Sequence, residues 1–307
     1  MAKKITVIGA GNVGGCAALR MAQDNLGDIM LIDVVSGLAR GKACDLEDAR
    51  ALVQTPYSIT GSADIRDLKD SDIIVVTAGL ARKPGMTRED LLKKNAEILK
   101  GICEQITVLA PQAVVIIVTN PLDVMTRYAL RITGFKPNRL FGMGVSLDAS
   151  RFANLISLKT GVPVTQIQAC VIASHGEAML PMPRFTLVNG KPLAELLPQA
   201  EIDELIKRTV ERGKEIVSFL GTGSAFVAPS AAIAELVRAI VRDQSATIGV
   251  STLLCGEYGV NDVCAGVPCL INKNGIGKII QLTLNTQEAQ QFKTSCESIR
   301  ALGGLIG

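Results

Sequence analysis

The sequence predicts an α/β protein whose first half forms a doubly wound parallel sheet and whose second half is an α+β unit. In the first half, short apolar runs alternate with longer amphipathic ones, which is the order of βαβ units. A glycine-rich turn directly follows the first apolar run, and the alternation ends near Gly142-Met143-Gly144. Because 307 residues exceed the usual size of a single core, we expect two domains, residues 1–143 and residues 144–307.

The first half contains four expected strands and two well-marked helices. The apolar runs place strands at residues 4–9, 29–33, 72–77 and 113–119. The first helix is expected over residues 13–22. The second should run from Thr87 to Ala110, because Thr87 with Asp90 three residues later resembles a capping box and Pro111 ends the pattern.

The second half mixes helices and strands in a different order. Helices are expected at residues 148–160, 201–220, 229–242 and 286–301, and strands at 167–173, 247–254 and 277–284. The pair Asn189-Gly190 lies between residues 185–188 and 191–192, and this pair favours the tight turn of an antiparallel hairpin. We therefore expect an α+β domain, and the candidate residues His175, Asp148 and Arg151 described below would make it the substrate-binding and catalytic one.

Composition and charge argue against several classes of function. The net charge of +3 is spread along the chain, and aromatic residues amount to only 3%, so a nucleic-acid partner is not expected. The apolar runs are far shorter than a membrane span. The first strand begins so close to Met1 that a cleaved signal peptide would destroy it. We therefore expect no membrane association and a cytoplasmic location.

The cysteines do not indicate a metal site. There are eight cysteines without a C-x-x-C pair, and there is one histidine, whereas structural zinc sites are built from closely spaced Cys and His. In a cytoplasmic chain of this size, such cysteines are expected to be reduced and to pack as small apolar residues. We therefore expect neither a metal nor disulfides.

A dinucleotide site is predicted at the turn after the first strand, Gly9-Ala10-Gly11-Asn12-Val13-Gly14. This G-x-G-x-x-G pattern could be a plain tight turn, but it joins a strand to a helix, so its N–H groups would face a pyrophosphate. Asp33 ends the second strand, 19 positions after Gly14, where it could accept from ribose hydroxyls or be a solvated strand end. Because a carboxylate repels a ribose 2′-phosphate, the pattern favours NAD over NADP.

His175 is the only histidine and the first candidate for catalysis. Hydride transfer from an alcohol carbon to NAD needs a base for the hydroxyl proton, and imidazole titrates in the right range. His175 follows the expected strand 167–173, and Gly176 lets the backbone turn sharply. A lone histidine is often structural, but a loop position held by a strand favours a functional role.

Asp148 and Arg151 form a second candidate pair. They stand three residues apart on an expected helix, which puts them on one face. They could be an ordinary surface ion pair. Alternatively, Arg151 would clamp a substrate carboxylate with two parallel N–H bonds, and Asp148 would orient His175 and stabilise its imidazolium.

Two further segments follow strand ends. Residues 77–88 lie where open α/β sheets bind ligands, and their glycines could hinge a lid that delivers Arg82 and Arg88 to a developing alkoxide and to an anion. Both could instead be solvated loop charges. Asn120 could hydrogen-bond a substrate oxygen or serve the turn before Pro121. Because the chain has no G-x-S-x-G elbow, Ser174 is not expected to be a hydrolase nucleophile.

The ordered set of motifs resembles the lactate/malate dehydrogenase family, and within it most closely the malate branch of the lactate-dehydrogenase-like type. The resemblance covers essentially the whole chain. It rests on Gly9 to Gly14, Asp33, residues 81–88, residues 118–121, Leu147-Asp148-x-x-Arg151 and His175-Gly176. One departure is Glu177, where we would expect Asp after His-Gly.

The resemblance implies a role for each of these residues. His175 would accept and donate the proton with Asp148 as its partner, Arg151 would bind the substrate C1 carboxylate, and Arg88 would polarise the reacting oxygen. The implied cofactor-binding residues are Gly9, Ala10, Gly11, Asn12, Val13, Gly14, Asp33, Asn95, Val118, Thr119 and Asn120, of which Asn120 would touch the substrate as well. The family also implies a homodimer or homotetramer.

Arg82 indicates which acid is the substrate. The family's lactate enzymes typically carry Gln at that loop position, whereas Arg suits a second carboxylate. A charge-assisted bidentate contact is worth about 1.5–3 kcal/mol, or about 10–150-fold in selectivity. The sequence therefore predicts NAD-dependent, reversible oxidation of (S)-malate to oxaloacetate, a reaction of the tricarboxylic acid cycle. L-lactate or another 2-hydroxy acid is the alternative substrate, and a non-catalytic NAD-binding sensor is a distant alternative.

Overall fold

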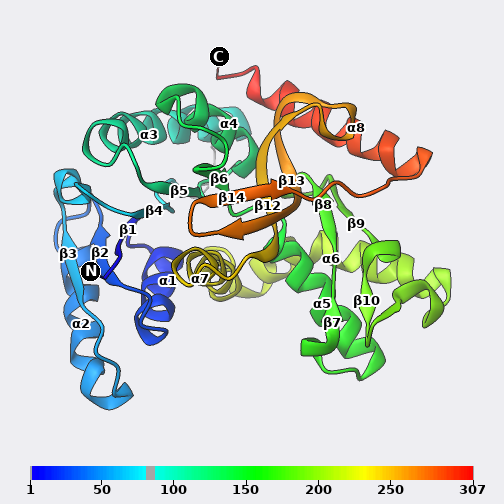
Figure 1. Ribbon diagram of the computed structural model, residues 1–307, viewed down its shortest axis with the longest axis horizontal. Coiled ribbons are helices and arrows are strands. Elements are labelled where there is room, and N and C mark those ends of the chain that lie inside the picture. Colours follow the sequence, from blue (N-terminus) through cyan, green and yellow to red (C-terminus); the bar gives the residue numbers. More distant parts are fainter. Residues whose placement is uncertain (1, 81–86, 307) are drawn as a thin grey trace.

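A computed structural model describes residues 2–80 and 87–306, with only the backbone described at Arg88. The first half alternates strands and helices, as expected (Figure 1). Its elements are β1 (Lys4–Ile8), α1 (Asn12–Gln23), β2 (Asp28–Ile32), α2 (Leu38–Val53), β3 (Ile59–Ser62), β4 (Ile73–Val76), α3 (Arg88–Leu109), β5 (Val114–Ile117), α4 (Leu122–Thr133) and β6 (Leu140–Gly142).

The second half contributes helices at its start, middle and end, with short strands between them. Its elements are α5 (Ser146–Thr160), β7 (Ile167–Gln168), β8 (Val171–Ala173), β9 (Met179–Pro181), β10 (Leu187–Val188), β11 (Lys191–Pro192), α6 (Gln199–Leu220), α7 (Val227–Val241), β12 (Ala246–Cys255), β13 (Asn261–Asn272), β14 (Gly275–Ile279) and α8 (Thr286–Gly303).

The six strands of the first half are parallel and lie in the order β3-β2-β1-β4-β5-β6. Helices α3 and α4 cover one side of this sheet and α1 covers the other (Figure 1). Every residue of β4 and β5 is buried, as expected for parallel strands covered on both faces. The chain reverses its direction of travel across the sheet between β1 and β4, and the open α/β rule places the ligand site there. The predicted doubly wound α/β fold is confirmed.

The sheet continues into the second half. β6 pairs antiparallel with β12 at Gly142 and Ser251, and β13, β8 and β9 extend the sheet beyond β12. This pairing brings strands of the second half beside the carboxyl end of β6. The domain boundary at residues 143 and 144 stays a prediction.

Local sequence signals account for several elements. Thr87 and Asp90 form a reciprocal capping box at the start of α3, as predicted. The Asn189-Gly190 turn joins β10 to β11 in an antiparallel hairpin, also as predicted. Among the helices of residues 2–80 and 87–306, none combines the length and the hydropathy needed to cross a bilayer.

Two expected strands were wrong in extent. Residues 167–173 do not form one strand: β7 joins the β10–β11 hairpin in a separate three-stranded sheet, whereas β8 pairs with β13 and β9. The strand expected at 277–284 runs from Gly275 to Ile279 and does not extend to residue 284. In the first case one apolar run spans the point where the chain changes its partner sheet. In the second, the regular pairing with β13 ends at Ile279 although apolar residues recur as far as Leu284.

Candidate active site

The turn after β1 lies against the segment after β4, at the point where the strand order reverses. Gly9 has φ +104°, and a Cβ there would lie 2.7 Å from the backbone nitrogen of Ala78. A Cβ on Gly14 would lie 1.9 Å from the carbonyl oxygen of Gly9. In contrast, nothing lies within 4 Å of a Cβ built on Gly11. Two glycines therefore permit close packing of the turn, and the third leaves its outer surface open to a pyrophosphate.

Asp33 lies next to this turn, just past the end of β2. Its Oδ2 accepts from the backbone N–H of Ala10 at 2.7 Å, and its Oδ1 accepts from the N–H of Val35 at 2.9 Å. These bonds fix the half-buried carboxylate in one orientation. Since each carboxylate oxygen accepts more than one hydrogen bond, Asp33 retains acceptor capacity for ribose hydroxyls. The turn and Asp33 together suit an NAD dinucleotide.

Asn95 joins two segments that border this site. Its side chain is nearly fully buried in α3. Its Oδ1 accepts from the N–H of Leu80 at 2.8 Å, and its Nδ2 donates to the carbonyl of Asn120 at 2.9 Å. Thr119 adds a bond from its hydroxyl to the carbonyl of Ala78 at 2.6 Å. Asn95 and Thr119 therefore hold the segments after β4 and β5 together, and direct contact of Asn95 and residues 118–120 with the cofactor stays a prediction.

His175, Asp148 and Arg151 meet around one buried carboxylate. His175 lies beyond β8, and the other two residues lie in α5. Asp148 is fully buried, with Oδ2 2.7 Å from His175 Nδ1 and Oδ1 accepting from an Arg151 guanidinium nitrogen at 3.0 Å. The side chains of His175 and Arg151 are 14% and 13% exposed, so both are still open to a small ligand. The arrangement is a buried triad and not a surface ion pair.

The pair with Asp148 sets the charge of His175. Burial disfavours the charged imidazolium and is the largest single effect, but the charge of Asp148, the hydrogen bond to it and the charge of Asp123 together outweigh it. The pKa of His175 is therefore raised above its ordinary value. A histidine in this state can give up a proton to a substrate oxygen near neutral pH.

Asp123 binds the backbone of the same histidine, and the sequence analysis did not identify this residue. It lies in the first turn of α4 and is 3% exposed. Its Oδ2 accepts from the backbone N–H of His175 at 2.8 Å, and its Oδ1 accepts from the Ser251 hydroxyl at 2.7 Å. Burial raises the pKa of Asp123, although these hydrogen bonds act in the opposite direction. An acidic residue in the first turn of a helix is usually exposed and stabilises the helix by its interaction with the helix dipole. The sequence therefore gives no sign that Asp123 is buried.

Helix α6 closes over the arginine side of the triad. A Cβ built on Gly213 would lie 3.8 and 3.9 Å from the two terminal guanidinium nitrogens of Arg151, which is ordinary packing distance. The next residue, Lys214, pairs with Glu177 at 3.1 Å. Glu177, the departure from the family pattern, thus links the loop that carries His175 to α6.

The two arginines expected on the lid cannot be placed beside this triad. Arg82 lies outside the described residues, and Arg88 starts α3 with a side chain that is also outside them. Their substrate contacts stay predictions. Within the described ranges, no group of three or more His, Cys, Asp or Glu residues could hold a metal ion, and all eight cysteines are free.

The chain is similar to known proteins along nearly its full length. The model of the lactate/malate dehydrogenase NAD-binding domain matches residues 3–142, and that of the lactate/malate dehydrogenase α/β C-terminal domain matches residues 145–302. A malate dehydrogenase from Methanosarcina mazei is 45% identical over 97% of both chains. One from Chlorobium chlorochromatii is 44% identical over 96% of both.

Solved structures show the same similarity. A malate dehydrogenase from Cryptosporidium parvum has a TM-score of 0.96 and 38% identity, with coverage of 100% of this chain and 99% of that one. A lactate dehydrogenase from the same organism, solved with lactic acid and NAD, has a TM-score of 0.96 at 34% identity and covers 100% and 98%.

Proposed function

The chain belongs to the lactate/malate dehydrogenase family, and from this premise we propose that it catalyses the reversible oxidation of (S)-malate to oxaloacetate with NAD. The observation that carries the proposal is the triad of His175, Asp148 and Arg151 around one buried carboxylate. When bound, NAD supplies the acceptor for the hydride that leaves the alcohol carbon. A non-catalytic NAD-binding sensor would have no use for a histidine held in this way.

His175 carries the proton in this proposal. Because Nδ1 is engaged by Asp148, proton transfer to and from the substrate oxygen falls to Nε2. In malate oxidation the neutral ring accepts the hydroxyl proton, and Asp148 stabilises the imidazolium that forms. In oxaloacetate reduction the imidazolium donates the same proton back.

Arg151 binds the C1 carboxylate of the substrate. Its contact with Asp148 uses one of five guanidinium N–H groups, so two parallel bonds to a carboxylate remain possible. The same carboxylate of Asp148 therefore orients both the proton carrier and the substrate anchor. Arg88 completes the site by polarising the reacting oxygen, and Asn120 by binding the substrate beside the cofactor.

Arg82 binds the second carboxylate and thereby distinguishes malate from lactate. We expect the protein to reduce oxaloacetate far more efficiently than pyruvate. In Arg82→Gln, kcat/KM for oxaloacetate should fall about 10- to 150-fold, because a charge-assisted bidentate contact is lost. NADH consumption with each oxoacid measures both effects.

Pyruvate itself provides the control, since it has no second carboxylate and its kcat/KM should not fall in the variant. If the unaltered protein uses pyruvate more efficiently than oxaloacetate, the malate proposal is wrong and a lactate dehydrogenase takes its place.

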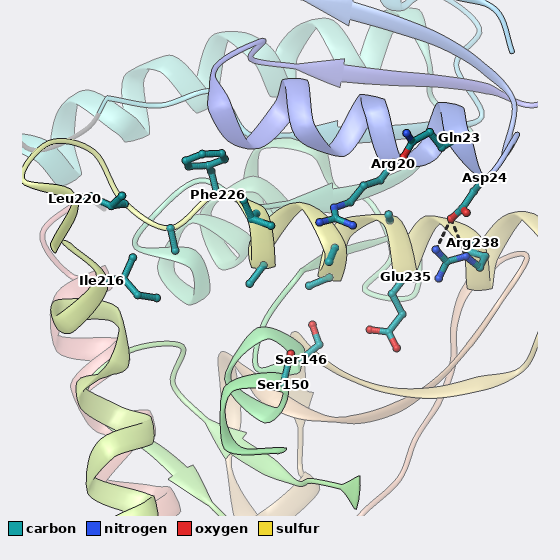
Figure 2. A pocket seen from close by; sticks show the side chains of 16 residues that line it. Arg20, Gln23, Asp24, Ser146, Ser150, Ile216, Leu220, Phe226, Glu235 and Arg238 are labelled. Carbon is teal, nitrogen blue, oxygen red and sulfur yellow. Dashed lines mark hydrogen bonds and ion pairs between the residues drawn. The ribbon is translucent and has the colours of Figure 1, made fainter. Parts of the chain in front are cut away.

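A homodimer or homotetramer is a further part of the proposal. A groove of about 790 Å³ runs between α1, α5, α6 and α7. Figure 2 shows Ile216, Leu220 and Phe226 at one end and the Asp24–Arg238 ion pair at the other. A second copy that covered this groove would bury these apolar side chains, as subunit interfaces do, and would also meet the charged side chains of Arg20 and Glu235 that line it. Sedimentation should then give a mass of at least two chains, and a monomer at micromolar concentration would contradict it.

The proposal also includes a cytoplasmic location and a place in the tricarboxylic acid cycle. The eight free cysteines suit a reducing compartment. The substrate pair, malate and oxaloacetate, supports the place in the cycle.

A further inference from the structure

A lysine of the second helix lies against the dinucleotide turn. Lys42 extends from α2, and its Nζ donates to the carbonyl oxygen of Gly11 at 2.9 Å. A Cβ built on Gly15, in the first turn of α1, would lie 2.9 Å from this Nζ and 3.1 Å from Lys42 Cδ. Gly15 is not one of the three glycines of the fingerprint. The absence of a side chain at Gly15 is therefore what leaves room for Lys42.

The charge of Lys42 is available to a ligand. The side chain is half-buried, and its ammonium has three N–H donors, of which one is used on Gly11. Within the part of the chain that the structure describes, Lys42 forms no ion pair with a carboxylate. An ammonium without a carboxylate partner, beside the N-terminus of α1, adds to the positive potential of that helix end.

We propose that Lys42 is a phosphate-binding residue of the cofactor site, which strengthens binding of the NAD diphosphate, and that Gly15 is glycine to give it room. The proposal rests on the NAD-dependent function proposed above. Backbone N–H groups alone offer partial charges to a dianionic diphosphate, whereas an ammonium supplies a full one. The two residues act together, because Lys42 can reach the turn only if residue 15 has no side chain.

Lys42→Met tests the charge while it retains most of the side-chain volume. Three probes separate the possible roles: NADH and ADP, which carry a diphosphate, and adenosine, which carries none. We expect NADH and ADP to bind about tenfold more weakly, which corresponds to the loss of one charge-assisted contact, and adenosine to bind as before. NADH fluorescence gives the first Kd, and calorimetry gives the other two.

Arg40→Met is the matched control. It removes the same charge from α2, but Arg40 lies two residues away and therefore about 200° around the helix from Lys42, and its side chain is exposed. NADH affinity should stay within about twofold in this variant, because exposed charges are screened by solvent and salt.

Gly15→Ala tests whether Gly15 is needed to leave room for Lys42. The new methyl group would collide with the flexible end of Lys42, so NADH affinity should fall in the otherwise unaltered protein. NADH affinity should not fall further when Gly15→Ala is added to Lys42→Met, because the ammonium group that the methyl would displace is already absent. Ala also favours a helix interior over Gly, so thermal unfolding without cofactor should not move to lower temperature.

Three results would overturn the proposal: unchanged NADH and ADP affinity in Lys42→Met, an equal loss for adenosine, or fully additive losses in the double variant. An equal loss for adenosine would mean that Lys42 acts by holding the turn and not by binding phosphate. Failure of the unaltered protein to bind NADH would instead reject the NAD-dependent function, so the two failures are distinguishable.

Discussion

His175→Asn is expected to bind NADH with unchanged affinity and to lose about 10²- to 10⁴-fold in turnover of oxaloacetate, the usual contribution of a positioned acid/base group. Asparagine can still hydrogen-bond to Asp148, which lies 2.7 Å from the ring nitrogen of His175. It cannot accept or donate the substrate proton. NADH consumption gives the turnover, and NADH fluorescence gives the affinity.

The neighbouring serine supplies the control. Ser174→Ala alters the same loop, where the Ser174 hydroxyl donates to Asp123 at 3.3 Å, but it leaves the acid/base group in place. Turnover in Ser174→Ala should therefore stay within about tenfold, because the Ser174 contact is long and Asp123 keeps its hydrogen bonds from the His175 N–H and the Ser251 hydroxyl. If His175→Asn retained turnover close to that of Ser174→Ala, His175 would not be the proton carrier.

The strands and helices with strong local signals were predictable. β4 and β5 are wholly buried, so in the sequence they are short, continuous runs of β-branched residues, which their length and composition identify as strands. The start of α3 follows from the capping box at Thr87 and Asp90. The dinucleotide turn was predictable because its glycine spacing directly follows a strand and opens a helix, although the contact of Gly9 with Ala78 comes from a distant segment.

The elements shaped by distant parts of the chain were not predictable. β13 was not expected, because Gly266 and Pro268 within it usually argue against a strand. The structure requires Gly266, since a Cβ there would lie 2.4 Å from the Val145 side chain and 2.8 Å from the carbonyl of Ala173. Residues 167–173 likewise form one apolar run, and only the tertiary pairing of β7 and β8 with different sheets divides it.

The residues of the candidate site likewise fall into those that could be predicted from the sequence and those that could not. The grouping of His175, Asp148 and Arg151 could be expected, because the chemistry of an alcohol oxidation needs a base, its partner and a cation for the substrate carboxylate. Asp123 could not be expected, since it acts through the backbone of His175, and nothing in its own neighbourhood specifies that role. The reaction itself specifies which residue types must touch a substrate. The residues that hold the His175 loop in position are specified only by the three-dimensional structure.

Asp148→Asn should both slow the reaction and change its pH dependence. Oxaloacetate reduction needs the imidazolium, which persists at pH values below the pKa of His175. Burial lowers that pKa, but the charge of Asp148, the hydrogen bond to it and the charge of Asp123 together raise it further than burial lowers it. Removal of the Asp148 charge therefore lowers the pKa of His175. The pH above which kcat/KM for oxaloacetate declines should therefore move to lower values. Turnover should fall about 10²- to 10⁴-fold, because the charge that stabilises the imidazolium is lost.

Asp123→Asn is the matched variant for this test. It removes the other carboxylate that raises the pKa of His175, but that carboxylate contacts the backbone N–H and not the ring. Its downward shift of the pH profile should accordingly be the smaller of the two. A profile that stays in place in Asp148→Asn would mean that Asp148 holds the ring in position without setting its charge. A larger shift in Asp123→Asn would mean that Asp123, behind the loop, has the greater effect on the pKa of His175. The main role of Asp148 would then be to hold Arg151 in position.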